Sequence, residues 1–517
     1  MTHTDQPAST KKQIRGSSLL LVGRFLSMGV NFVVQVLIVR HLTQGEFGAF
    51  SYALTFVAMG ESLATFGLDR AITRFVPIYH EREDYPRLFG AIVMVVGSVI
   101  GLGVAVVVAV LGLQGFIGGT LIDDPLAVQL LVILVFLAPI QAFDEVLVGL
   151  FAVFANPRAI FFRKHVVGPA LKLAVVLVLV AWGSDAAFLA SGYVLAGALG
   201  IAIYTVVLAR ELAGTGLLQH FRAKDVRYPV GEVLAFTVPL LSSELVYTSM
   251  ASMDTLILGH FHGTEVVAAY RVVYPAARLN QVVLSSFGLL FTPAAARMFA
   301  REDRSGINEL YWRNATWIAV MSFPVFAATF ALARPVTELL YGARYADSWV
   351  FLALLSLGYY FNAALGQNGL TLKVFGKVRY VVAVNVATAL FNVAAGLLLI
   401  PRYGAIGAAV GTCATLVVFN VLKQAGLRLG TGIRLFDPRF GRAYAPIAGG
   451  AAGLLFLQIV TDAPVPVAVA FGAAASLVVL RSSRTVLDIE KMFPEILRIP
   501  LVRPLLGLPP RAGTLDP

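Results

Sequence analysis

Residues 40–50, RHLTQGEFGAF, form a short, turn-rich break between two long apolar runs. A weak copy of this region lies downstream, at a constant offset of 219 residues. The matching positions are Leu37-Ile38 with Leu256-Ile257, His41 with His260, Glu46 with Glu265 and Ala49 with Ala268. The segment that follows is also echoed, because residues 75–77 and 82–84 resemble residues 291–293 and 301–303. A repeat at this distance predicts two copies of one multi-helix unit.

The composition identifies a membrane protein. Of the 517 residues, 58% are hydrophobic and 13% are charged, whereas soluble domains carry about 25% charged residues. Uncharged runs such as residues 91–110 can cross a hydrocarbon core of about 30 Å as a helix. The net charge of +11 fits basic loops that flank membrane helices, so we expect no nucleic-acid partner. Cys413 is the single cysteine, which excludes a disulfide framework.

We therefore predict an all-α membrane protein of about fourteen transmembrane helices. The expected helices lie near residues 17–40, 49–68, 88–112, 126–154, 164–182, 186–209, 230–259, 265–291, 311–333, 345–371, 376–400, 405–426, 442–461 and 464–481. The predicted organisation is a cytoplasmic tail (1–16), an N-terminal six-helix lobe (17–215), a C-terminal six-helix lobe (216–430), helices 13–14 (431–483) and a cytoplasmic tail (484–517).

The basic residues predict the orientation. With a cytoplasmic N-terminus, roughly 32 of them fall inside and about four outside, so both termini are expected in the cytoplasm of a cell-membrane protein. Six helices separate the two copies of the repeat. An even number gives both lobes the same orientation, which is a parallel repeat of the kind found in transporters that move two lobes around a central site.

Charged and polar residues inside the predicted helices are the candidate site, because a charge that faces lipid costs about 2.5–3.5 kcal/mol. In the first helix, Arg24, Asn31 and Gln35 share one face at helical spacing. In the eighth, Arg271 and Arg278 are seven residues apart, with Tyr274 at the edge and Pro275 predicted to kink the helix. The remaining membrane charges are Lys172 and the acidic residues Glu61, Asp144, Glu145, Glu244 and Asp254, which could instead form ion pairs that fasten helices together.

The sequence lacks the motifs expected for several other functions. The sequence has no G-x-x-x-x-G-K-[ST] phosphate loop and no H-E-x-x-H set. His260 and His262 lack acidic or cysteine neighbours, so we expect no metal site there. The expected outer loops are short, about 13 residues at most, which leaves little room for catalytic groups. We therefore predict that the protein is not an enzyme and uses no cofactor beyond a coupling ion.

Three stretches resemble the polysaccharide and lipid-linked oligosaccharide flippases of the multidrug/oligosaccharidyl-lipid/polysaccharide exporter superfamily. They are LIVRHLTQGEFGAFSYAL (37–54), GLDRAITRFVP (67–77) and NVAAGLLLIPRYGAIGAAVGT (392–412). The similarity extends over about residues 15–427. It implies transfer of an isoprenoid-diphosphate-linked oligosaccharide from the cytoplasmic to the outer leaflet, for polysaccharide biosynthesis, by alternating access. Polysaccharide assembly proteins and membrane lipids are the implied partners.

In such a flippase, Arg24, Lys172, Arg271 and Arg278 would hold the diphosphate, while Asn31, Gln35 and Tyr274 would meet sugar hydroxyls. Glu244 or Asp254 would couple transport to protons or Na⁺. A cation-coupled multidrug exporter of the same superfamily is the first alternative, because the acidic residues could bind organic cations. A membrane sugar polymerase or transferase is the second.

Overall fold

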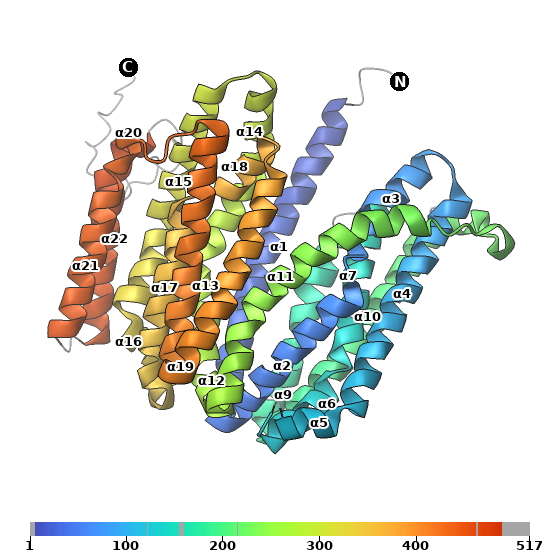
Figure 1. The fold of residues 1–517 in the computed structure, drawn as a ribbon, viewed down its shortest axis with the longest axis horizontal. Coiled ribbons are helices and arrows are strands. Elements are labelled where there is room, and N and C mark those ends of the chain that lie inside the picture. The colour runs from blue at the N-terminus through green and yellow to red at the C-terminus, as the bar shows by residue number, and fades with distance from the viewer. Residues whose placement is uncertain (1–5, 121, 155–159, 215, 462–463, 489–517) are drawn as a thin grey trace, which may run out of the picture. The chain divides into compact units, whose positions relative to one another are not determined.

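The computed structural model describes residues 6–120, 122–154, 160–214, 216–461 and 464–488 (Figure 1). Within these ranges every regular element is helical, which confirms the predicted all-α class. The chain forms two compact units, which divide between Arg271 and Val272. The predicted lobe boundary at residues 215/216 stays a prediction, and most of the predicted C-terminal tail lies outside the described residues.

The first unit contains twelve principal helical segments. They are α1 (Gln6–His41), α2 (Gln44–Thr65), α3 (Asp69–Glu81), α4 (Tyr85–Gly112), α5 (Gln114–Thr120), α6 (Pro125–Leu134), α7 (Leu137–Phe154), the π-helix η1 (Phe162–Val167), α9 (Gly168–Trp182), α10 (Ala186–Gly214), α11 (Val230–His262) and α12 (Thr264–Arg271). The central element is α2, which packs against α4, α6, α7, α11 and α12.

Residues 40–50 begin this central helix. Thr43 is the N-cap of α2, and its hydroxyl accepts a hydrogen bond from the Glu46 N–H at 3.2 Å. In return the Glu46 carboxylate accepts from the Thr43 N–H at 2.9 Å. This reciprocal capping box satisfies two of the backbone donors that a helix start leaves open. Two residues later, a Cβ on Gly48 would lie 1.9 Å from the Thr264 carbonyl oxygen, so glycine is what allows α12 to lie against α2.

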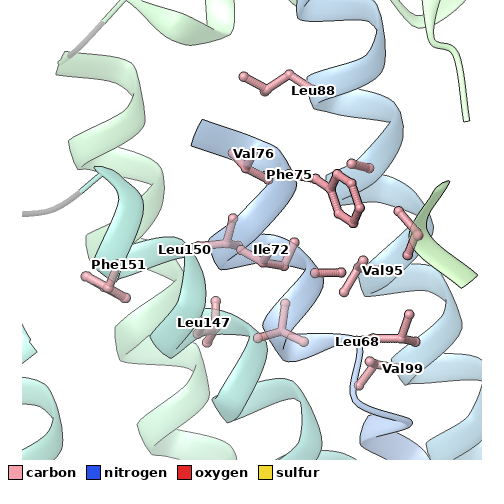
Figure 2. Packing of buried hydrophobic residues seen from close by; sticks show 14 of the residues in the cluster. Leu68, Ile72, Phe75, Val76, Leu88, Val95, Val99, Leu147, Leu150 and Phe151 are labelled. Atoms are coloured by element: carbon pink, nitrogen blue, oxygen red, sulfur yellow. The ribbon is translucent and has the colours of Figure 1, made fainter. Parts of the chain in front are cut away.

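The segment after α2 forms α3, an amphipathic helix. The sequence predicted only a connection here, between the membrane helices near 49–68 and 88–112. The buried face of α3 carries Ile72, Phe75 and Val76, while Arg70 and Arg74 are exposed. Figure 2 shows this face against Val95 and Val99 of α4 and against residues of α7. Burying apolar surface stabilises by about 25 cal/mol per Å², so α3 fastens the turn after α2 to the body of the unit.

The second unit also consists of helices. They are α13 (Tyr274–Arg278), α14 (Val282–Ala300), α15 (Arg304–Phe326), the π-helix η5 (Ala327–Ala331), α16 (Ala333–Tyr341), α17 (Trp349–Ala364), α18 (Asn368–Val374), α19 (Val378–Thr431), α20 (Pro438–Gly441), α21 (Tyr444–Val460) and α22 (Val465–Leu487), with short 3₁₀ turns at Leu279–Gln281 and Ala343–Ser348. The long α19 contains a break at Gly404, where φ is 55° and ψ is −133°. It therefore corresponds to the two predicted helices at 376–400 and 405–426.

Among the described residues, nine segments are long and apolar enough to cross a membrane, or ten if the bent pair within residues 264–300 forms one span. One of these segments is α19, which holds two predicted helices. The count is compatible with fourteen transmembrane helices without establishing that number.

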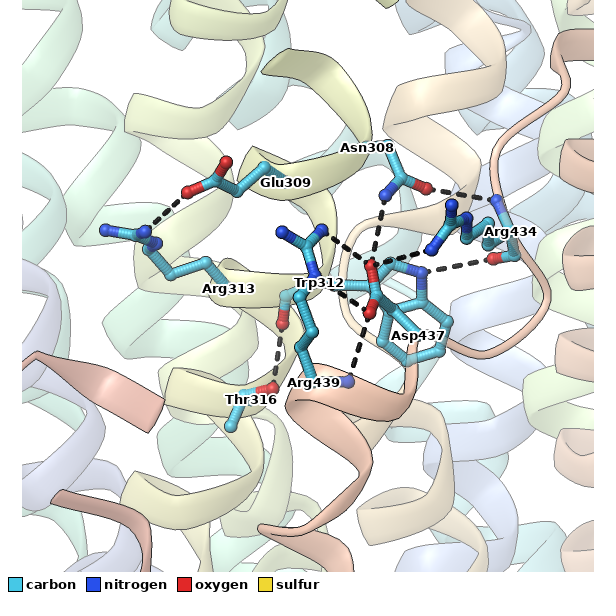
Figure 3. Close-up of polar contacts among 8 residues, drawn as sticks. All are labelled: Asn308, Glu309, Trp312, Arg313, Thr316, Arg434, Asp437 and Arg439. Atoms are coloured by element: carbon cyan, nitrogen blue, oxygen red, sulfur yellow. Dashed lines mark hydrogen bonds and ion pairs between the residues drawn. The ribbon is translucent and has the colours of Figure 1, made fainter. Parts of the chain in front are cut away.

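A polar cluster attaches the connection between α19 and α21 to α15 (Figure 3). The Asp437 side chain is fully buried and accepts from Nε and Nη2 of Arg439 at 3.1 and 2.8 Å. Asn308 of α15 donates to Asp437 at 3.4 Å and accepts from the Arg434 N–H at 3.0 Å. Trp312 Nε1 donates to the Arg434 carbonyl at 3.1 Å. The cluster fixes the position from which α21 and α22 start.

Candidate functional site

Two large cavities differ sharply in chemistry. In the second unit, a cavity of about 560 Å³ lies between α15–α16 and α22, and apolar side chains line almost all of it. In the first unit, a cavity of about 480 Å³ is lined by residues from α1, α2, α7, η1, α9 and α10. Charged and polar side chains are numerous only in the latter of these two cavities. A polar ligand within the membrane would therefore bind in the first unit's cavity, which we call the N-cavity.

The described residues that line the N-cavity include three carboxylates and three cations. The carboxylates belong to Glu61 of α2 and to Asp144 and Glu145 of α7. The cations belong to Arg163 and Lys164 of η1 and to Lys172 of α9. Hydrogen-bonding groups without formal charge complete the lining, and these are Asn31, Gln141, Tyr193 and Tyr204. Both signs of charge and several neutral donors and acceptors thus meet in one cavity.

Arg163 is the most buried of the cations, with 4% of its surface exposed. Its Nη2 donates to the Asp144 backbone carbonyl at 2.9 Å and pairs with the Asp144 carboxylate. The guanidinium carbon lies 4.6 Å from the ring centroid of Tyr204 and 5.5 Å from that of Phe151. The Tyr204 hydroxyl donates to the Arg163 carbonyl at 2.9 Å. These contacts fix the guanidinium plane at the cavity wall.

The local backbone explains why Arg163 turns inward. Residues 162–167 form a π-helix, whose wider turn changes which side chains share a face, and such turns are frequent at functional sites. The same turn buries His165, whose Nδ1 lies 3.0 Å from the Ser27 hydroxyl of α1. On α9, Lys172 is exposed to the cavity, and its ammonium group lies 5.8 Å from the Tyr193 ring centroid.

Two of the predicted ligand residues line the N-cavity, namely Asn31 and Lys172. Arg24 lies two turns before Asn31 on α1 and is exposed, and its carbonyl accepts from the Ser27 hydroxyl at 3.0 Å. Gln35 is half-buried one turn after Asn31. Neither Arg24 nor Gln35 belongs to the lining of the N-cavity. Their predicted contacts with substrate stay predictions.

The predicted residues of the eighth helix lie on two separate helices. Arg271 ends α12, whereas Tyr274 and Arg278 lie on α13. A turn at residues 272–273 separates the two helices, next to the predicted kink at Pro275. The shared face of the two arginines stays a prediction. Within the second unit, the Arg278 guanidinium lies 5.7 Å from the Tyr274 ring centroid, and Tyr274 packs edge-on against Tyr359.

The two predicted coupling residues are both on α11. Asp254 is 5% exposed, and the Tyr270 hydroxyl of α12 donates to its carboxylate at 3.4 Å. The side chain of Glu244 lies outside the described residues. The coupling role of either residue stays a prediction.

Sequence reasoning missed Arg163 because it assigned this residue to the basic cytoplasmic segments that set orientation. Tyr193 and Tyr204, which also line the N-cavity, were missed because aromatic residues in membrane helices are common. One signal was available. Asp144 lies inside a predicted membrane helix, and a carboxylate there requires a partner.

Two family models match long stretches of this chain. The family model described as polysaccharide biosynthesis protein matches residues 14–299, and a second model, MatE, matches residues 239–398. The succinoglycan biosynthesis transport protein ExoT of Rhizobium meliloti (strain 1021) is 28% identical over 370 residues, which cover 69% of this chain and 67% of that protein. The lipopolysaccharide biosynthesis protein WzxC of Escherichia coli (strain K12) is 22% identical over 67% of this chain and 66% of its own length.

Among solved structures, the inward closed conformation of the lipid II flippase MurJ is similar in fold, with a TM-score of 0.67 at 13% identity. The similarity covers 93% of this chain and all of that one. The first family model spans more than half of the chain. This multi-pass membrane protein therefore belongs to the polysaccharide biosynthesis protein family of the multidrug/oligosaccharidyl-lipid/polysaccharide exporter superfamily.

Proposed function

We propose that this protein is a flippase that moves a lipid-linked oligosaccharide from the cytoplasmic to the outer leaflet of the cell membrane, by alternating access. The observation that carries the proposal is the N-cavity, where Arg163, Lys164 and Lys172 line a space within membrane-spanning segments. These cations can give charge-assisted hydrogen bonds to an anionic ligand in exchange for the lining carboxylates that balance their charge in this structure. The diphosphate of an isoprenoid carrier is an anion that must cross the membrane with its sugar.

The remaining lining suits the rest of such a substrate. Asn31, Gln141 and Tyr193 offer amide and hydroxyl groups to sugar hydroxyls. The proposal is also supported by the family membership and by the transport role in the name of ExoT. Translocation needs no covalent chemistry, so the proposal assigns no catalytic residue and no cofactor. Coupling to a proton or Na⁺ gradient belongs to the proposal, and polysaccharide assembly proteins are the proposed partners.

A test of this proposal is the substitution Lys172→Ala. A charge-assisted hydrogen bond contributes about 1.5–3 kcal/mol, so we expect flipping of a polyprenyl-diphosphate-linked oligosaccharide in proteoliposomes to fall about 10- to 100-fold. The control is Lys224→Ala, which removes the same charge from an exposed position in the connection after α10. Wild-type flipping by the Lys172→Ala protein would contradict a diphosphate site in the N-cavity.

A multidrug exporter is the second candidate. The MatE match and the carboxylates Glu61, Asp144 and Glu145 favour it, because organic cations bind to acidic cavities. Deletion of the gene distinguishes the two. A flippase deletion removes a surface glycan and leaves susceptibility to cationic drugs unchanged, whereas an exporter deletion raises drug susceptibility and leaves the glycan intact.

A further inference from the structure

We propose that Asp144 is an internal counter-anion of Arg163, and that a diphosphate group replaces it on the guanidinium when Asp144 takes up a proton. The inference rests on the proposed function, because it concerns the same N-cavity. It makes substrate binding and proton uptake a single coupled event. The coupling would then lie at this ion pair, in addition to any role of Asp254.

Arg163 has hydrogen-bonding capacity that Asp144 does not use. Asp144 engages Nη2, while Nε and Nη1 are buried and have no hydrogen-bond partner among the described residues. Leaving a buried donor unsatisfied costs about 1–3 kcal/mol, and more when the group is charged. A phosphate presents three oxygens and pairs with two guanidinium nitrogens at once. Arg163 could therefore donate more hydrogen bonds to a phosphate than it donates to Asp144.

The two partners of the ion pair differ in burial. Arg163 is held in place by two aromatic rings and its side chain is 4% exposed, whereas the Asp144 side chain is 36% exposed. Asp144 therefore has access to water and room to turn away. Arginine keeps its proton under all ordinary conditions. The acid is accordingly the partner that can change its charge and leave.

The formal charges that line the N-cavity balance one another. Three carboxylates face three cations, so the described lining has no formal excess of positive charge. A diphosphate that entered without compensation would make the cavity strongly negative, which a low-dielectric site opposes. Protonation of Asp144 removes one negative charge from the carboxylate that competes with the substrate for Arg163. The substrate and the proton would then favour each other's binding, as linkage requires.

Other titratable groups surround the pair and contribute to the same balance. They are Arg24 of α1, Glu61 of α2, Asp69 of α3, Glu145 of α7, Lys164 and His165 of η1, Lys172 of α9, and Tyr193 and Tyr204 of α10. Asp144 differs from the other acids in that its carboxylate pairs with the buried Arg163. The test must therefore change Asp144 itself.

The experiment measures binding of inorganic diphosphate to the full-length protein in detergent, by calorimetry, between about pH 6 and about pH 8. We expect Asp144→Asn to bind about tenfold more tightly than the wild type at the upper pH, within the usual range of coupling energies. The advantage should shrink at the lower pH, because a higher proton concentration favours the proton uptake that accompanies binding to the wild type. Because both proteins meet the same probe, its own titration cancels in the comparison.

Two further variants complete the design. Arg163→Gln should weaken binding with or without Asp144→Asn, because it removes the receptor. Asp185→Asn is the matched control, since Asp185 is exposed at the start of α10, outside the cavity lining, and Asn caps a helix equally well. Equal affinity and equal pH dependence in the wild type and Asp144→Asn would overturn the inference. Wild-type binding by Arg163→Gln would do the same.

The outcome also separates this inference from the proposed function. If Lys172→Ala abolishes diphosphate binding while the Asp144 and Arg163 variants behave as the wild type, the anion site stands and the counter-anion mechanism falls. If the wild type binds no diphosphate, both fall. Should Asp144→Asn fail to fold, Asp144→Ser takes its place in the same comparison, and equal affinity and equal pH dependence in the wild type and Asp144→Ser would refute the mechanism.

Discussion

The carboxylate of Asp437 is fully buried, yet it is ionised because its neighbours favour the charged form. Hydrogen bonds from the Arg439 side chain, followed by that residue's backbone N–H and its charge, lower the pKa of Asp437 below its ordinary value. A carboxyl group whose pKa is lowered by folding stabilises the protein above its unfolded pKa, which is about 3.9. That contribution is lost as the pH falls through the folded pKa.

We therefore expect Asp437→Asn to destabilise the protein near neutral pH and to have little effect in acid. The expected loss is about 1–3 kcal/mol, mainly from hydrogen bonds, because Arg439 is exposed and its ion pair is screened by water. The measurement is the midpoint of denaturant unfolding of both proteins at neutral pH and near pH 3.

Asp303→Asn is the matched control for this prediction. Asp303 is an exposed N-cap of α15 whose pKa is lowered chiefly by the backbone N–H of Gly306. Asn replaces Asp well at such a position, so its effect should be small. Equal destabilisation by the two substitutions would show that burial of Asp437 is unimportant.

Among single residues, the sequence alone identified Asn31 and Lys172, which line the N-cavity. Both lie inside long apolar runs, where a polar side chain stands out and needs a partner. Arg163 lies at the end of such a run and resembles an ordinary basic anchor. Its inward orientation depends on a π-helical turn, and periodicity cannot reveal one inserted residue in a helix.

The contact between α2 and α12 depends on one small residue. Since a Cβ at position 48 would lie 1.9 Å from the Thr264 carbonyl oxygen, Gly48→Ala forces two backbones apart. Overpacking of this kind costs about 1–3 kcal/mol, and we expect a lower unfolding midpoint.

Gly29→Ala is the control for this prediction, because nothing lies within 4 Å of a Cβ at that position in α1. Alanine is the better helix former, so its effect should be neutral or slightly stabilising. Equal midpoints for Gly48→Ala and the wild type would contradict the close approach of α2 and α12.

Among the elements, long apolar runs were predictable because they need only length and hydropathy to be recognised. The end of α1 and the start of α2 followed from the break at residues 40–50. In contrast, α3 was not predicted, since a helix of 13 residues with exposed arginines resembles a cytoplasmic loop. What stabilises it as a helix is the apolar surface of α4 and α7, against which its own apolar face packs.

For the whole molecule, the predicted orientation can be tested with single cysteines. Cys413→Ser would give a cysteine-free background, because Cys413 is the single cysteine of the chain. In intact cells, a membrane-impermeant maleimide should then label Gln114→Cys, on the predicted outer side, and spare Lys224→Cys. Inverted vesicles should reverse the pattern. Labelling of Lys224→Cys in intact cells would contradict cytoplasmic termini.

The attachment of the α19–α21 connection to α15 has a mechanical consequence for the second unit. With Asp437 fastened to Asn308, and with α22 packed along α15, the final helical pair cannot swing independently of that helix. The final helical pair therefore moves together with α15. A fluorophore or spin label on the exposed side of α22 would consequently report the displacement of α15 during turnover.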